Sequence, residues 1–204
     1  MKGSILVVSG PSGSGKTSLA KEVCKELKDL AYFSISTTTR KIRDGEKDGV
    51  DYFFINKEEF LKDVEDGYFL EWAKVHGNFY GTSKKQINEA LKKGKIVFLD
   101  IDVQGYESVK KEYANITTGV FITTPSEKVL KERLLNRNTE TKSSLEVRLT
   151  NALKEMQKID EYDYLLINDD FNKAKEFLRA VALASLIKTT KYDIKKFIKK
   201  WRES

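Results

Sequence analysis

The chain of 204 residues has a single cysteine and a single histidine. One cysteine, Cys24, excludes an internal disulfide framework and is typical of a reducing compartment, so we expect a cytoplasmic protein. Cys24 lies within a helix pattern, which favours a small core residue over a reactive thiol. His76 falls beside a glycine in a turn pattern, and we expect no catalytic role for it. The chemistry of the chain therefore has to come from other side chains.

Long hydrophobic runs are also missing from the sequence. No segment is long enough to span a bilayer, and the first three residues lead directly into a strand pattern, which leaves no room for a signal peptide. With 40% hydrophobic and 33% charged residues, the chain can bury a core and stay in solution. Its length suits one α/β domain with additions. We expect a monomer or a homodimer without a membrane partner.

The net charge of +6 indicates an anionic partner. That partner is either a nucleic acid or a small polyanion such as a nucleotide. The basic residues are spread through the chain and gather from Lys188 to Arg202. This tail is predicted to end a helix with a solvated basic face, because nothing beyond charge supports a nucleic acid role. We therefore expect no nucleic acid partner.

Residues 5–8 are apolar and run into the sequence Gly-x-x-x-x-Gly-Lys-Thr, after which a helix pattern begins. A buried strand, a glycine loop and a helix in this order are typical of a phosphate-binding P-loop. Glycines bring backbone N–H groups close to phosphate oxygens, and the start of the helix adds partial positive charge. Lys16 is predicted to reach the terminal phosphates, and Thr17 to offer its hydroxyl to Mg²⁺. The predicted ATP-binding residues of this loop are Gly10, Pro11, Ser12, Gly13, Ser14, Gly15, Lys16 and Thr17.

Strand patterns alternate with helix patterns through most of the chain. Alternation of this kind predicts right-handed βαβ units, and hence an α/β fold with a parallel P-loop sheet and helices on both faces. Capped helices are expected to begin at Ser83, Ser126 and Ser143. A final long helix is expected to carry Phe177 and Leu186. The expected strands of this sheet cover residues 5–8, 32–36, 96–102, 119–122 and 164–167.

Residues 36–82 have a different composition. Strand patterns at 51–55 and 68–75 flank a short helix with an Asn56–Glu59 cap, so we expect a small α+β insertion with its own aromatic core. The insertion and a helical lid are expected to lie above the carboxyl edge of the sheet. The predicted division is core at 1–35, 83–125 and 160–204, insertion at 36–82 and lid at 126–159.

Asp100 directly follows the apolar run of residues 96–99. A parallel strand presents its last residues at the carboxyl edge of the sheet, where ligands bind in α/β folds. Next to a P-loop, an aspartate at this point is expected to hold Mg²⁺ together with Thr17. The sequence leaves open whether that contact is direct or runs through water.

Three arginines are candidates for phosphate contacts from the lid. Arg133 and Arg137 are four apart and are predicted to share a helix face, and Arg148 lies in the next helix. Spacing alone favours ordinary surface charge. Phosphoryl transfer favours arginines on a closing lid, because they stabilise charge on the transferring group and exclude water.

The insertion supplies two cations and two phenolic hydroxyls suited to a phosphate: Arg40, Arg43, Tyr52 and Tyr80. It also supplies Glu71, whose neighbours Leu70 and Trp72 look buried. A buried carboxylate is costly unless it is paired. The N1–H and N2–H groups of guanine would pair it, whereas adenine presents an acceptor at N1. The alternatives are an exposed strand residue for Glu71 and aromatic core for Tyr52.

Seven motifs in order along the chain resemble the guanylate kinase family. Together with the P-loop, these motifs make the resemblance cover residues 5–182. They are Ser36–Arg40, Arg43–Glu46, Asp51–Tyr52, Glu71–Ala73, Gly77–Thr82, Leu99–Gly105 and Arg137–Thr141.

The resemblance implies an ATP:GMP phosphotransferase of purine metabolism and GMP recycling that uses Mg²⁺ and accepts GMP or dGMP. The GMP phosphate would be held by Ser36, Arg40, Arg43, Tyr52 and Tyr80. Guanine would be held by Glu71, Thr82 and Asp102. Asn168 would lie near adenine. The implied catalytic residues are Lys16, Arg133, Arg137 and Arg148.

Two alternatives to this function remain on sequence grounds. One is an interaction module, because guanylate-kinase-like domains of scaffold proteins bind phosphorylated partners without catalysis. The presence of Lys16, Thr17 and Asp100 argues against that reading. The other is a kinase for a different nucleoside monophosphate, against which the predicted pairing of Glu71 with guanine argues.

Overall fold

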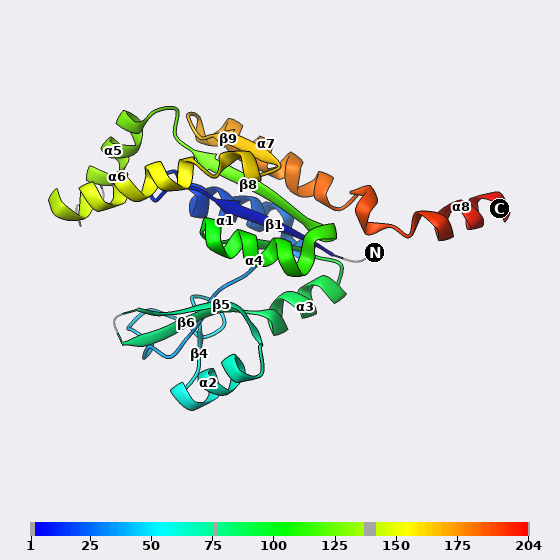
Figure 1. The fold of residues 1–204 in the computed structure, drawn as a ribbon, viewed down its shortest axis with the longest axis horizontal. Helices are drawn as coiled ribbons and strands as arrows, with labels where there is room; N and C mark the ends of the chain where they lie inside the picture. Colours follow the sequence, from blue (N-terminus) through cyan, green and yellow to red (C-terminus); the bar gives the residue numbers. More distant parts are fainter. Residues whose placement is uncertain (1–2, 76, 137–141, 204) are drawn as a thin grey trace.

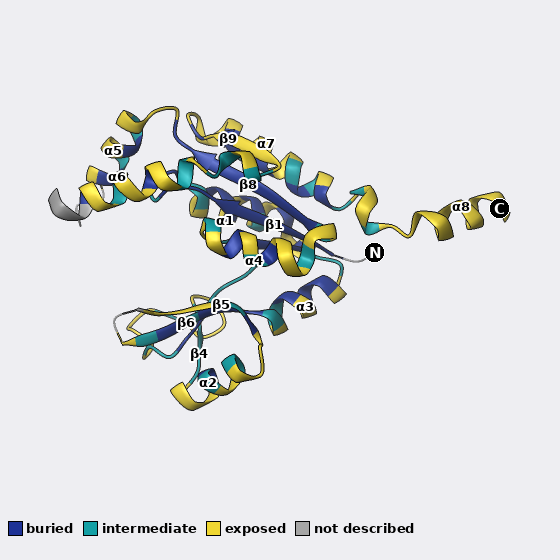
Figure 2. Ribbon diagram, viewed as in Figure 1, coloured by how far each residue is buried: buried dark blue, intermediate teal, exposed yellow. Residues whose placement is uncertain are grey.

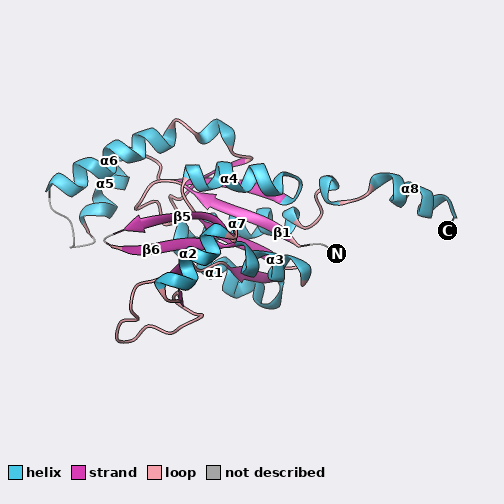
Figure 3. Cartoon of the chain, turned by 60° about the horizontal axis from the view of Figure 1, so that its bottom comes forward, coloured by secondary structure: helices cyan, strands magenta, loops and turns pink. Residues whose placement is uncertain are grey.

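The computed structural model describes residues 3–75, 77–136 and 142–203 and contains two sheets with helices around them (Figures 1 and 3). The strands are β1 (Ser4–Ser9), β2 (Ala31–Phe33), β3 (Thr37–Thr38), β4 (Phe53–Phe54), β5 (Phe69–Val75), β6 (Asn78–Ser83), β7 (Ile96–Asp100), β8 (Thr117–Thr123) and β9 (Tyr164–Ile167). The α-helices are α1 (Lys16–Leu27), α2 (Lys57–Glu65), α3 (Lys84–Lys92), α4 (Val103–Tyr113), α5 (Glu127–Leu135), α6 (Lys142–Met156), α7 (Phe171–Ser185) and α8 (Ile194–Glu203). Short 3-10 helices are η1 (Lys28–Leu30), η2 (Ala114–Ile116), η3 (Ile159–Glu161) and η4 (Thr189–Lys191).

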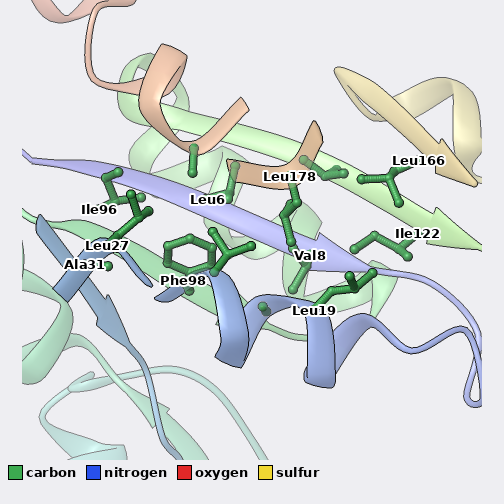
Figure 4. Close-up of a cluster of buried hydrophobic side chains, with 14 of the residues drawn as sticks. Leu6, Val8, Leu19, Leu27, Ala31, Ile96, Phe98, Ile122, Leu166 and Leu178 are labelled. Carbon is green, nitrogen blue, oxygen red and sulfur yellow. The ribbon is translucent and has the colours of Figure 1, made fainter. Parts of the chain in front are cut away.

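The main sheet is parallel and has the strand order β2-β7-β1-β8-β9. The central strand β1 is fully buried, and its side chains alternate between the two faces. Leu6 and Val8 join a core with α1 and α7 (Figure 4), whereas Ile5 and Val7 join a core with α3 and α4. Helices therefore cover both faces, as expected for a parallel sheet. The predicted α/β fold is confirmed.

The second sheet has the order β4-β3-β6-β5 and mixes one parallel pair with two antiparallel ones. Helix α2 packs on it and is capped by Asn56, whose side chain accepts a hydrogen bond from the backbone N–H of Glu59. Together they enclose a small aromatic core that is separate from the two cores of the main sheet. Figure 1 shows this unit beside the main sheet.

Several predicted elements differ from the structure. Strand β7 ends at Asp100, and Asp102 caps a helix, α4, that the sequence analysis did not predict. Strand β2 is shorter than expected, so Ser36 lies in a loop. Ser83 precedes α3 but makes no side-chain cap hydrogen bond. Helix α6 begins at Lys142, one residue before the predicted cap.

The aromatic core of the insertion provides a test of packing. Phe60 is fully buried, and its ring stacks on Phe69 and Phe79 with centroids 4.3 and 5.4 Å away. Phe60→Ala is expected to lower the free energy of unfolding by about 3–5 kcal/mol, because it leaves a cavity. Phe177→Ala, at a side chain that is 66% exposed, should change it by less than about 0.5 kcal/mol. Equal effects in urea unfolding would contradict this packing.

The C-terminal end of the chain also differs from the expectation. Helix α7 ends at Ser185, and a separate helix, α8, follows after η4. Both views of the ribbon show α8 extending away from the rest of the molecule (Figures 1 and 3), and its residues are exposed (Figure 2). None of the described helices combines the length and the apolar character that crossing a lipid bilayer requires.

Candidate active site

The loop between β1 and α1 has the backbone shape that phosphate binding requires. Gly10, Gly13 and Gly15 have φ values of 136°, 93° and 86°, which side chains rarely tolerate. A Cβ at Gly10 would lie 2.0 Å from the carbonyl oxygen of Ile122, so this position also has no room for one. The loop opens into α1 at Lys16, where backbone N–H groups and the helix dipole favour an anion.

Asn168 contacts the backbone of this loop. Its Nδ2 donates to the carbonyl oxygen of Ser14 at 2.7 Å, and its backbone N–H donates to the carbonyl oxygen of Thr123 at 2.7 Å. The side chain of Asn168 is buried, with 3% of its surface exposed. The amide therefore supports the P-loop backbone, and the position near adenine that the family resemblance implies stays a prediction.

Two of the three predicted lid arginines reach the P-loop region. Arg148 on α6 donates from Nη1 to the hydroxyl of Ser12 at 2.9 Å. Arg133 on α5 donates from Nη2 to the carbonyl oxygen of Asn168 at 2.9 Å. Arg137 lies outside the described residues, so its place on the same helix face as Arg133 stays a prediction.

Thr17 and Asp100 meet at the carboxyl edge of the sheet. The Thr17 hydroxyl donates a hydrogen bond to Oδ2 of Asp100, although the two residues are 83 positions apart. Both groups present hard oxygen atoms beside the P-loop, which is the donor chemistry that Mg²⁺ prefers. No group of three or more His, Cys, Asp or Glu side chains suited to a metal occurs in the part of the chain that the structure describes. An ion at this point would therefore need phosphate and water oxygens as further ligands.

A cleft of about 520 Å³ lies between the insertion and the main sheet. It unites four of the predicted GMP-binding residues: Ser36, Glu71, Tyr80 and Asp102. The first turns of α4 form its other wall, which is why the undetected helix matters for the site. The residues that α4 adds are Gln104, Gly105 and Ser108.

The two carboxylates of this cleft have different environments. Oε1 of Glu71 accepts a hydrogen bond from the Thr82 hydroxyl at 3.0 Å, while Oδ1 of Asp102 accepts the backbone N–H of Gly105 at 2.8 Å. Burial raises the pKa of Glu71 above its ordinary value, the negative charge of Asp102 raises it further, and the Thr82 hydrogen bond opposes both. Trp72, predicted to be buried, is 48% exposed. A Cβ at Gly105 would lie 2.9 Å from Oε2 of Glu71, so the backbone of α4 packs against this carboxylate.

The predicted phosphate contacts of the insertion are partly assembled. Arg40 makes a two-point ion pair with Glu46 at 2.7 and 2.9 Å, and its guanidinium lies 5.3 Å from the ring centroid of Tyr52. The rings of Tyr52 and Tyr80 pack edge to face at 6.0 Å. The backbone N–H of Arg43 donates to Oε2 of Glu46 at 2.9 Å, and the positive charge of Arg43 helps to lower the pKa of Glu46. Glu46 fixes both ends of the arginine loop.

Residues 2–184 match the family model for guanylate kinase. The chain belongs to the guanylate kinase family. It is 50% identical over 201 residues to the guanylate kinase of Sulfurimonas denitrificans, with 98% of this chain and 97% of that protein covered. It is 48% identical over 201 residues to the guanylate kinase of Wolinella succinogenes, with 98% and 93% covered.

A solved structure agrees with this membership. The crystal structure of guanylate kinase from Anaplasma phagocytophilum is 32% identical, covers 93% of this chain and 89% of its own, and has a TM-score of 0.70. The family resemblance read from the motifs is therefore confirmed, and with it the class of nucleoside monophosphate kinases.

Glu155 is a charged neighbour of the site that sequence reasoning missed. It lies on α6, seven residues after Arg148 and hence on the same helix face. Burial raises the pKa of Glu155, Lys16 lowers it and Asp102 raises it, so this carboxyl group lies near both the P-loop lysine and the cleft. The i, i+7 spacing from Arg148 was the available signal.

Proposed function

We propose that the chain transfers the γ-phosphoryl group of ATP to GMP, giving ADP and GDP, and that the reaction requires Mg²⁺. The observation that carries this proposal is the neighbouring placement of two different sites. A P-loop with Lys16 and Thr17 adjoins a cleft that is lined by Glu71 and Asp102. Asp100 contacts the P-loop residue Thr17, and Asp102, two residues later, lines the cleft.

The cleft accounts for the choice of a guanine base. An ionised carboxylate at Glu71 accepts hydrogen bonds from adjacent N–H groups, and guanine offers them at N1 and N2. Adenine places an acceptor at N1, which would face the carboxylate without a hydrogen bond. We propose that Thr82 and Asp102 complete the contacts with the base. We propose dGMP as a second acceptor, because the proposed base contacts do not involve the sugar.

The phosphate of GMP is proposed to bind among Ser36, Arg40, Tyr52 and Tyr80, with Arg43 closing over it from the same loop. This places a phosphate oxygen for in-line attack on the γ-phosphorus of ATP. The new P–O bond forms as the bond to the β–γ bridging oxygen breaks, and ADP leaves with that electron pair. The protein contributes positioning and charge stabilisation rather than a covalent intermediate.

On the ATP side, the P-loop N–H groups and Lys16 are proposed to hold the β- and γ-phosphates. Arg133, Arg137 and Arg148 are proposed to neutralise the transferring group from the lid, with Asn168 acting through the P-loop backbone that it supports. Thr17 and Asp100 would hold Mg²⁺, which would supply positive charge to neutralise the phosphates. We propose that the lid helices exclude water, which would otherwise compete with GMP.

Product analysis tests the proposal directly. In a mixture of ATP, Mg²⁺ and GMP, phosphorus NMR should show ADP and GDP formed in equal amounts, without free phosphate. Release of inorganic phosphate with no GDP would show that GMP is not the acceptor and would overturn the proposal.

The Arg40 contact allows a narrower test. Arg40→Lys keeps one positive charge but loses the two-point geometry that a guanidinium offers to a phosphate. We expect KM for GMP to rise by about tenfold, with KM for ATP little changed. Arg179→Lys on α7, whose guanidinium lies 4.0 Å from Glu26 and does not line the cleft, is the matched control. An unchanged KM for GMP in Arg40→Lys would count against the phosphate site.

A further inference from the structure

Helix α8 has an apolar face on which none of the residues is buried. Its four large apolar residues follow the spacing i, i+3, i+4 and i+7, so they form one stripe. They are Ile194, Phe197, Ile198 and Trp201, and their exposed fractions are 46%, 60%, 43% and 72%. A helix of ten residues with such a stripe in water is only marginally stable by itself, because tertiary packing supplies most helical stability.

The C-terminal segment that contains α8 carries most of the net positive charge of the protein. The segment 188–204 holds seven Lys and Arg residues and two Asp and Glu residues, which gives five of the six net positive charges. Residues 1–187 are therefore close to neutral, with a net charge of +1. Within α8 the charged residues are Lys195, Lys196, Lys199, Lys200, Arg202 and Glu203.

The position of α8 separates it from the candidate active site. The match to the family model ends at residue 184, before α8 begins. Figures 1 and 3 show the helix at the far end of the molecule from α5 and α6. Nothing in the proposed reaction uses its residues, so its stripe and its charge need another explanation.

We propose that α8 docks reversibly on an anionic lipid surface. A helix with cations on one face and Trp, Phe and Ile on the other inserts its apolar face at the boundary of headgroups and acyl chains, while its cations contact anionic headgroups. This proposal replaces the expectation from composition that the chain has no membrane partner. It concerns a surface and is independent of the proposed phosphoryl transfer.

Charge and apolarity together favour lipid over other occupants. A second α8 would bring four further net positive charges to the first, and the nearly neutral body of a second copy offers no long-range attraction. A nucleic acid would satisfy the cations but would leave the aliphatic stripe of Ile194 and Ile198 in water. Of these three occupants, the anionic lipid surface is the one that supplies both negative charge and an apolar phase.

Co-sedimentation of the full chain with vesicles tests the proposal. Vesicles of phosphatidylcholine with phosphatidylglycerol should bind the chain at least about tenfold more strongly than phosphatidylcholine alone, and added salt should weaken the binding. Lys195→Gln combined with Lys196→Gln should weaken it by about 30-fold. The matched control is Lys57→Gln with Lys62→Gln, two exposed cations of α2, which should leave binding unchanged.

The apolar stripe has its own test. Trp201→Ala should lower vesicle binding by about tenfold, whereas Phe177→Ala, an equally exposed aromatic on α7, should not. In a Trp72→Phe background, the fluorescence of Trp201 should shift to shorter wavelength on vesicles. Equal binding to both kinds of vesicle, or binding that survives the lysine and tryptophan changes, would overturn the proposal. So would α8-dependent dimers in vesicle-free buffer, or displacement of the chain from vesicles by duplex DNA.

Discussion

Glu71→Gln is expected to lower kcat/KM for GMP by about 10³-fold. The amide keeps one oxygen acceptor but turns an N–H donor toward the N–H groups of guanine, and a hydrogen bond to a charged group contributes about 1.5–3 kcal/mol. Most of the loss should be in KM for GMP, because the carboxylate lies in the cleft rather than among the P-loop groups. Steady-state kinetics with ATP in excess measures it.

Glu65→Gln is the matched control for this change. Glu65 ends α2 on the surface of the insertion, so the same loss of charge in the same domain should leave kcat/KM unchanged. Unaltered turnover of GMP in Glu71→Gln would remove the base-reading role proposed for the carboxylate. Equal losses in both variants would point to the charge of the insertion as a whole.

The protonation of Glu71 should make binding of the base depend on pH. Burial raises the pKa of this carboxyl, so it takes up a proton at a higher pH than an ordinary glutamate. The ionised form accepts the N–H groups, so affinity is present above the raised pKa and is lost as the pH falls through it. Guanosine, which carries no phosphate, isolates this effect in a titration between about pH 4.5 and 8.

Thr82→Val is expected to shift the pH midpoint of guanosine binding. The Thr82 hydrogen bond lowers the pKa of Glu71, so its removal should move the midpoint of guanosine binding to higher pH. A midpoint that stays in place, or affinity that increases as the pH falls, would contradict ionised Glu71 as the acceptor.

Lys16→Met is expected to lower kcat by about 10³-fold. A cation placed where negative charge develops stabilises the transition state more than the bound substrates, so turnover should fall more than GMP affinity. Lys16 opens α1 beside the three P-loop glycines. Lys25→Met in the last turn of the same helix is the control, and it should retain full turnover. A Lys16→Met variant with normal kcat would contradict its contact with the transferring phosphates.

The P-loop strand was predictable because its signal is local. Four consecutive apolar residues indicate a strand that is buried on both faces. The glycines that follow can adopt positive φ values that other residues rarely adopt. Helix α4 was missed because the pattern Leu99–Asp102 resembles a longer strand. The spacing of Tyr106, Val109 and Tyr113, with Asp102 as a cap, was the helical signal in that segment.

Other features of the site depend on contacts between distant residues. Asn168 meets the Ser14 carbonyl across 154 positions, and no pattern near Asn168 specifies that partner. Trp72 was expected to be buried from its apolar character, but its place on β5 leaves it partly in solvent. The motif resemblance supplied the cleft residues as a set, yet only the fold shows that α4 forms the opposite wall.

The measurement that tests the central claim most directly is turnover with ATP and Mg²⁺, comparing GMP with AMP as acceptor at equal concentration. The account predicts GDP formation with GMP and a kcat/KM for AMP lower by about 10⁴-fold, because adenine leaves the Glu71 carboxylate without its hydrogen bonds. Equal turnover of both acceptors would contradict base reading by the cleft. Binding of GMP without turnover of either acceptor would contradict phosphoryl transfer itself.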